Sequence, residues 1–130
     1  MSQENVEIVR QGYEHYNRTG EPDFGAFDPE VQWISDPRTG QDQIRGRDKL
    51  IEFFADRASM FSEMRIEVER TWDWDDQVLA FVRVAGSGSA SGAGFEIRIA
   101  HLWTLLDGKL IRCQGFGNRD EALEAAGLRE

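Results

Sequence analysis

Apolar residues recur with helical spacing in two stretches of the chain. In the first stretch they form one face from Val6, Val9, Tyr13 and Tyr16. Ser2 can cap this helix, and Gly20 suits the left-handed position that ends one. The second stretch, residues 47–62, forms its apolar face from Leu50, Phe53, Phe54, Ala58 and Phe61. The spacing predicts two amphipathic helices, with a short helix at residues 24–27 between them.

Alternation of apolar and polar residues predicts strands over most of the remaining chain. These strands lie at residues 30–36, 64–72, 77–85, 95–106 and 109–117. Asp107-Gly108 is a strong hairpin signal, and the Gly/Ser/Ala-rich residues 86–94 indicate an irregular hairpin end. Asn118, followed three residues later by Glu121, can cap a last short helix that ends at Gly127.

This order of elements predicts an α+β fold, because helices come first and the strands follow together as a mainly antiparallel sheet. The chain has 130 residues. Since a chain of this length buries enough surface for one core, we expect a single domain spanning residues 1–130.

The net charge of −9, from 24 acids and 15 bases, argues against a nucleic-acid partner. The longest apolar run is too short to cross a bilayer, and the N-terminus lacks the basic start of a signal peptide. We therefore expect a cytoplasmic protein without a membrane partner. One cysteine and two histidines predict no internal disulfide and no metal site, and no motif indicates a cofactor.

Several segments resemble one known family in their order and spacing. They are ENVEIVRQGY at residues 4–13, FDPEVQW at 27–33, GRDKLIEFF at 46–54, AHLWTL at 100–105 and DGKLIR at 107–112. Together they resemble the SnoaL-like, ketosteroid isomerase-like branch of the nuclear transport factor 2-like superfamily. The resemblance implies a cone-shaped roll in which a curved sheet and the N-terminal helices enclose a pocket. It also implies a homodimer, which we expect to form through the sheet.

Asp36 matches the position at which ketosteroid isomerases carry their proton-shuttling aspartate. Its apolar neighbours Trp33 and Ile34 predict a raised pKa, suited to a general base. The isomerase pattern is incomplete, because the position of its second acid holds Ala100. An aspartate before proline is also a common turn-former, and this alternative stays open.

Two further polar residues resemble parts of related active sites. His101 resembles the histidine of SnoaL-type cyclases, although no carboxylate follows on the next predicted strand. We expect His101 or Tyr16 to donate a hydrogen bond to a developing oxyanion. Arg98 resembles the arginine of limonene epoxide hydrolases. It is expected to pair with Asp36 or with a ligand carboxylate, or alternatively with a glutamate on the sheet surface.

The predicted strand at residues 95–106 has two possible orientations. Simple alternation puts His101 and Trp103 on its more apolar face, whereas the isomerase register turns Arg98 and Leu102 toward the pocket. Cys113 is expected to be an inert buried thiol beside glycines that leave volume for a ligand. The expected ligand-binding residues are Arg98, Trp33, Tyr13, Leu102 and Cys113.

These observations predict a cofactor-independent protein that binds a small hydrophobic, oxygenated molecule. If the pocket is catalytic, we expect the acid–base chemistry of an isomerase, a cyclase or an epoxide hydrolase, with Asp36 as the base. The missing second acids favour the alternative, a non-catalytic ligand-binding or dimerisation module.

Overall fold

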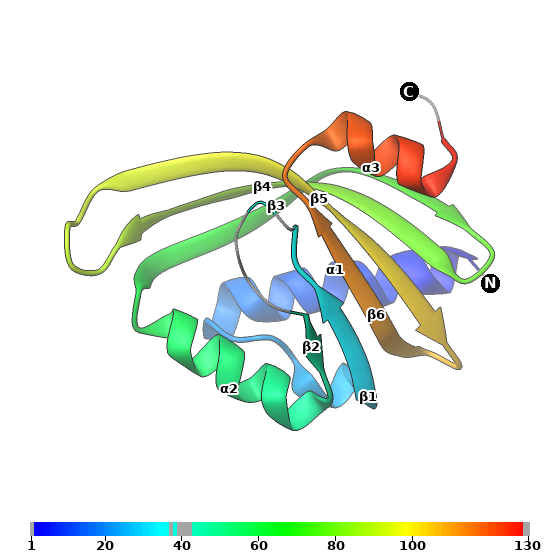
Figure 1. The fold of residues 1–130 in the computed structure, drawn as a ribbon, viewed down its shortest axis with the longest axis horizontal. Coiled ribbons are helices and arrows are strands. Elements are labelled where there is room, and N and C mark those ends of the chain that lie inside the picture. Colours follow the sequence, from blue (N-terminus) through cyan, green and yellow to red (C-terminus); the bar gives the residue numbers. More distant parts are fainter. Residues whose placement is uncertain (1, 37, 39–42, 129–130) are drawn as a thin grey trace.

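The computed structural model describes residues 2–36, 38 and 43–128. Figure 1 shows helices packed against one strongly curved sheet, which confirms the predicted α+β class and the cone-shaped fold. In chain order the elements are α1 (Ser2–Thr19), the 3-10 helix η1 (Phe24–Ala26), β1 (Phe27–Ile34), β2 (Ile44–Arg45), α2 (Arg47–Ala58), β3 (Phe61–Trp74), β4 (Gln77–Gly88), β5 (Gly94–Leu106), β6 (Lys109–Phe116) and α3 (Arg119–Ala126).

Within the described residues the strands form one open six-stranded sheet in the order β2-β1-β6-β5-β4-β3. Neighbouring strands pair antiparallel, except that β1 and β6 run parallel. The sequence predicted a mainly antiparallel sheet and gave no sign of this parallel pair. The pairing is possible because β1 and β6 are joined through all the intervening elements, a connection long enough for parallel strands.

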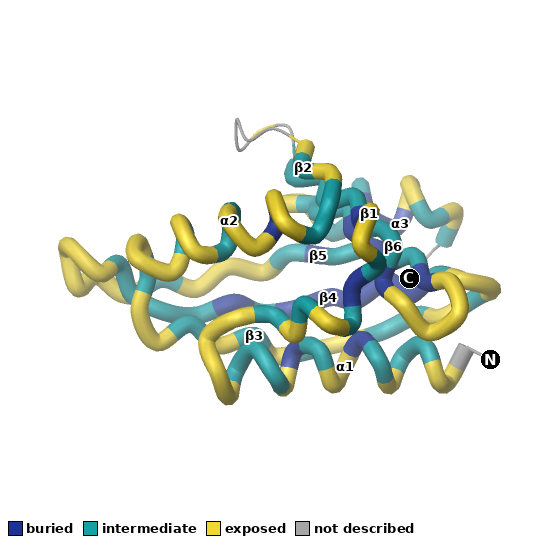
Figure 2. Tube along the Cα trace, turned by 90° about the horizontal axis from the view of Figure 1, so that it is seen from below, coloured by how far each residue is buried: buried dark blue, intermediate teal, exposed yellow. Residues whose placement is uncertain are grey.

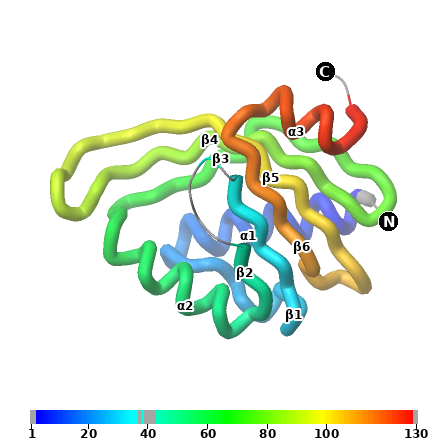
Figure 3. Tube along the Cα trace, in the orientation of Figure 1, coloured from blue at the N-terminus to red at the C-terminus, as the bar shows by residue number. Residues whose placement is uncertain are grey.

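Element boundaries differ from the predicted ones where pairing in the sheet overrides local pattern. The second long helix, predicted to reach residue 62, ends at Ala58 because Phe61 already pairs with Gly88 across β3 and β4. The glycine-rich residues 86–94 are partly strand, since β4 continues to Gly88 and β5 begins at Gly94. The tip of this hairpin lies far from α3 (Figure 3), and a 3.0 Å hydrogen bond from the Ser89 N–H to the Met60 carbonyl joins it to the turn between α2 and β3.

The predicted ends of the last helix are confirmed by their caps. The Asn118 side chain accepts a hydrogen bond from the Glu121 N–H at 3.0 Å, and this closes the first turn of α3. Gly127 adopts a left-handed conformation with φ of 72°, which ends the same helix without the steric cost of a Cβ atom.

The two faces of the sheet bury different sets of residues. The concave face, with α1 and α2, contains Val9, Tyr13, Val82, Val84 and Trp103. The other face packs against α3 through Leu79, Phe81, Ala100, Leu102, Ala122 and Leu123. Figure 2 shows buried residues concentrated in the middle of the molecule, with stretches of β4 among them. The concave face is where a cavity remains.

The outer face of the sheet beyond α3 is charged. Arg83 pairs with Glu67 at 2.6 Å, and Arg98 lies 3.7 Å from Glu69. Arg119, at the start of α3, also contacts Glu69, at 2.5 Å. These ion pairs are at least partly exposed, so water screens them and each contributes little to folding. The homodimer expected through the sheet stays a prediction.

Candidate functional site

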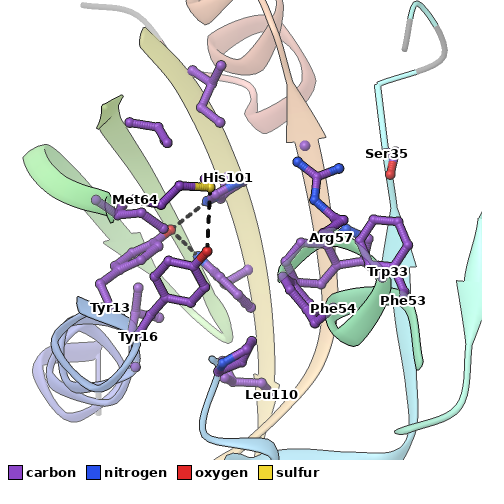
Figure 4. A pocket seen from close by; sticks show the side chains of 18 of the residues that line it. Tyr13, Tyr16, Trp33, Ser35, Phe53, Phe54, Arg57, Met64, His101 and Leu110 are labelled. Carbon is purple, nitrogen blue, oxygen red and sulfur yellow. Dashed lines mark hydrogen bonds between the residues drawn. The ribbon is translucent and has the colours of Figure 1, made fainter. Parts of the chain in front are cut away.

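A cavity of about 540 Å³ lies between the concave face of the sheet and helices α1 and α2. Its wall is mainly aromatic and aliphatic, with rings contributed by Phe27, Trp33, Phe53, Phe54, Phe61, Phe95, Trp103 and Phe116. A cavity of this size and character is typical of small-molecule sites. Figure 4 shows the lining side chains of α1, α2 and the sheet pointing toward one another.

Three polar side chains form a hydrogen-bonded chain at the base of this cavity. The Trp103 Nε1–H donates to the Tyr13 hydroxyl at 2.9 Å. That hydroxyl lies 2.7 Å from Nδ1 of His101, and Figure 4 shows Tyr13 and His101 side by side. Tyr13 comes from α1 because residues 9, 13 and 16 share its sheet-facing side. His101 and Trp103 come from β5, two residues apart and therefore on the same face of the strand.

The hydrogen-bond directions in this chain fix the tautomer of His101. An indole N–H can only donate, so the Tyr13 oxygen accepts from Trp103. If Nδ1 of His101 also donated to that oxygen, the buried Tyr13 proton would have no acceptor among the described residues, at a cost of about 1–3 kcal/mol. The Tyr13 hydroxyl therefore donates to Nδ1, and the imidazole proton sits on Nε2.

His101 lines the cavity, and its Nε2 carries the imidazole proton. Nε2 has no hydrogen-bond partner among the described residues, and it is not fully buried, unlike the unpartnered Nε of Arg112. Since the His101 ring lines the cavity, its Nε2–H is available to a ligand. Burial lowers the pKa of His101 to about 4, so the ring is neutral at neutral pH and acts as a hydrogen-bond donor.

Trp33 forms the aromatic wall beside this donor. Its ring centroid lies 6.2 Å from that of His101 and 5.8 Å from that of Trp103. On its other side it meets Phe54 of α2 edge-on, with centroids 5.3 Å apart. Trp33 therefore bridges the base of the cavity and α2, and it presents a flat apolar surface to a ligand.

Tyr16 and Arg57 add polar groups elsewhere on the cavity wall. The Tyr16 hydroxyl contacts the sulfur of Met64 at 3.7 Å, a weak acceptor. Burial raises the pKa of Tyr16, and the positive charge of Arg57 acts in the opposite direction. The Arg57 guanidinium lies over the rings of Phe53 and Phe61, at 5.3 Å and 5.7 Å from their centroids.

Asp36 lies on the cavity wall just beyond β1, but its environment differs from the predicted one. Its carboxylate accepts hydrogen bonds from the backbone N–H groups of Arg38, at 3.0 Å, and Gly117, at 2.7 Å. These two bonds lower the pKa of Asp36, with the Arg38 bond the larger cause. The predicted rise in pKa is therefore wrong, because Asp36 is partly exposed and acts as a turn-former. Gly117 has no side chain at this close approach, where a Cβ would lie 3.2 Å from Oδ2 of Asp36.

Three of the expected ligand-binding residues do not line the cavity. Arg98 is 59% exposed on the outer face and pairs there with Glu69, which agrees with the surface alternative. Leu102 is buried on the side of the sheet that packs against α3. Arg98 and Leu102 point away from the cavity because β5 follows simple alternation, which turns His101 and Trp103 toward the cavity. The register taken from the isomerases does not hold for this strand. Cys113 is buried in the core behind the cavity, and burial raises the pKa of its thiol.

The structure brings together Tyr13, Tyr16, Trp33, Asp36 and His101 from the expected set. It adds Arg57, Phe53 and Phe54 from α2. Sequence reasoning placed the two phenylalanines on a buried helix face but missed Arg57. The spacing of Arg57, three and four residues after them, is the signal that could have placed it on the same side.

The chain matches the family model of the SnoaL-like domain over residues 9–113. It therefore belongs to the SnoaL-like domain family. A comparison with curated proteins finds no match.

Solved structures share the fold at low sequence identity. An NTF2-like protein of unknown function from Burkholderia pseudomallei is 20% identical, with 95% of this chain and 97% of that chain covered and a TM-score of 0.77. TerC, co-crystallised with polyporic acid, is 22% identical, with 93% and 96% covered and a TM-score of 0.78. A proposed SnoaL-like polyketide cyclase from Jannaschia is 20% identical, with 99% and 95% covered and a TM-score of 0.77.

Two other kinds of functional element are absent from the described part of the chain. None of its helices combines the length and the apolar character that a membrane span requires. No three His, Cys, Asp or Glu side chains there come together as a metal-binding group.

Proposed function

We propose that the protein binds a small, mainly apolar molecule in the cavity and holds an oxygen atom of that molecule with the Nε2–H of His101. The observation that carries this proposal is the chain from Trp103 through Tyr13 to His101, which leaves one oriented donor facing an apolar space. A carbonyl, ether or hydroxyl oxygen supplies the acceptor that the donor lacks. The aromatic wall around Trp33 suits a flat ligand body.

Binding of two matched naphthalenes tests this proposal. 2-Acetylnaphthalene has a ketone oxygen, and 2-ethylnaphthalene has nearly the same shape without it. We expect the wild-type protein to prefer the ketone by about fivefold, since a neutral hydrogen bond is worth about 1 kcal/mol. His101→Phe should bind both compounds equally, while retaining affinity for the hydrocarbon. Equal affinity of the wild-type protein for the two compounds contradicts the proposal.

A catalytic form of the proposal is proton transfer at the carbon next to a ligand carbonyl. Asp36 lies on the wall of the same cavity, and its lowered pKa keeps it ionised and able to accept a proton at neutral pH. His101 would donate to the enolate oxygen as negative charge develops there. The low pKa also makes Asp36 a weak base, so binding without turnover is the alternative.

Deuterium exchange into the methyl group of 2-acetylnaphthalene separates these two forms. Catalysis by Asp36 predicts exchange above the background rate that falls about a hundredfold or more in Asp36→Asn, the usual contribution of a general base. The asparagine keeps an oxygen that can accept the Gly117 N–H, so the loop is retained. Binding with exchange at the background rate selects the non-catalytic role.

A further inference from the structure

Arg57 is a cation on the wall of an apolar cavity, and no acidic group pairs with it there. Among the described residues its guanidinium makes no ion pair and no hydrogen bond. By contrast, Arg83, Arg98 and Arg119 each pair with a glutamate. Arginines elsewhere in the described structure, such as Arg10, Arg45 and Arg65, also make no ion pair, so what distinguishes Arg57 is its position on the wall of the apolar cavity.

The guanidinium contacts the aromatic wall of the cavity. It lies over two aromatic rings of the cavity wall, those of Phe53, at 5.3 Å, and Phe61, at 5.7 Å from the ring centroids. Contact with ring faces orients the planar group without using its N–H donors. Arg57 therefore places a cation against the aromatic wall of the cavity, with N–H donors that no described residue accepts.

Tyr16 supplies a second donor to the same region. Tyr16 and Arg57 line the same cavity, from α1 and α2 respectively, and the charge of Arg57 acts to lower the pKa of the Tyr16 hydroxyl, against the effect of burial. The hydroxyl proton points at the thioether of Met64, 3.7 Å away. Because a thioether is a weak acceptor, a ligand oxygen can replace it at little cost.

We propose that Arg57 and Tyr16 form an anion-binding site within the cavity, and that the natural ligand carries a carboxylate in addition to its apolar body. A carboxylate accepts two parallel hydrogen bonds from the fork of a guanidinium, and its charge neutralises the unpaired cation. The inference rests on the proposed function, because it specifies one end of the molecule whose other oxygen is held by His101. Asp23 and Asp36 are the acids on the cavity wall, and neither pairs with Arg57 in the described structure.

A second pair of naphthalenes tests this inference. 2-Naphthoate and 2-naphthamide have the same size and shape, but only the first is charged at neutral pH. We expect the wild-type protein to bind the naphthoate about tenfold more tightly than the amide, as for a hydrogen bond to a charged group. Arg57→Gln should abolish that preference and leave affinity for the amide within about twofold.

Arg98→Gln is the matched control, because it removes the same charge from the exposed outer face. It should retain the preference for naphthoate, which excludes an effect of net charge alone. If neither naphthalene binds the wild-type protein, the proposed function fails and this inference fails with it. If both bind equally, or if the naphthoate preference survives in Arg57→Gln, only the anion site is overturned.

Discussion

The hydroxyl of Tyr13 lies 2.7 Å from Nδ1 of His101, although 88 positions separate the two residues in the sequence. This contact connects the first helix to the fifth strand and determines which nitrogen of the imidazole carries the proton. It converts a histidine on an apolar strand face into an oriented donor for the cavity.

The tautomer of His101 is the first consequence. We expect ¹⁵N NMR of histidine-labelled protein at pH 7 to show His101 with an unprotonated Nδ1 and a protonated Nε2. The signal should stay unchanged as the pH is lowered until about 4, the pKa that burial imposes. A protonated Nδ1, or titration near pH 6.5, contradicts donation from Trp103 to Tyr13 and from Tyr13 to His101.

Lower pH should also destabilise the fold through His101. The unfolded chain protonates this histidine near pH 6.5, but the folded protein does so only near pH 4. Between these values the unfolded state binds more protons, so stability falls as the pH is lowered and levels off below about 4. The shift corresponds to about 3 kcal/mol. Urea denaturation measures the free energy of unfolding at pH 7 and at pH 4.5. The decrease between these pH values should be about 2 kcal/mol larger for the wild-type protein than for His101→Phe. Equal decreases in the two proteins exclude a neutral buried His101.

Removing the Tyr13 hydroxyl should destabilise the protein more than removing that of Tyr16. Tyr13→Phe leaves both the Trp103 N–H and Nδ1 of His101 without partners, which costs about 2–3 kcal/mol. Tyr16→Phe loses only a contact with a thioether and should cost less than about 1 kcal/mol. Both substitutions are on α1 and delete the same atom, so chemical denaturation of the two variants gives a direct comparison. Similar losses of unfolding free energy in the two variants would mean that the hydrogen bonds of the Tyr13 hydroxyl do not stabilise the fold.

Two glycine positions test the packing around the cavity in opposite directions. A Cβ at Gly86 would lie 2.9 Å from Cγ of Met64 and 3.2 Å from its Cα, so Gly86→Ala should destabilise by about 1–3 kcal/mol. Gly12 is in α1, and a Cβ there would have nothing within 4 Å, so Gly12→Ala should stabilise by about 0.5–1 kcal/mol. Thermal melts measure both changes. Stabilisation by Gly86→Ala contradicts the close packing of β3 against β4.

Much of the fold could be predicted because it depends on local pattern. The spacing of Val9 and Tyr13 marks the buried face of α1, and alternation marks β5 with His101 and Trp103 inward. The parallel pairing of β1 with β6 could not be predicted, because it joins segments that are remote in sequence and carries no local signal. The two-residue strand β2 is too short to show any alternation.

The site was less predictable than the fold. The order of elements in the chain indicates that Asp36, just after β1, and Tyr16, on α1, lie beside the cavity. The pKa of Asp36 could not be predicted in the same way, because it depends on the backbone N–H groups of Arg38 and of Gly117, which is remote in sequence. The sequence left two orientations of β5 open, and Arg98 lies outside the cavity because the strand follows simple alternation. Arg57 was not predicted on the cavity wall, although its spacing from Phe53 and Phe54 indicates that side of the helix. Its lack of an ion-pair partner among the described residues depends on three-dimensional packing and is not visible in sequence.

The carbonyl stretching frequency of bound 2-acetylnaphthalene, measured by infrared difference spectroscopy, tests the role of His101 most directly. We expect a lower frequency in the wild-type protein than in His101→Phe, because a hydrogen bond from Nε2–H weakens the C=O bond. The same frequency in both proteins, with the ketone bound in each, would contradict the claim that His101 holds the ligand oxygen.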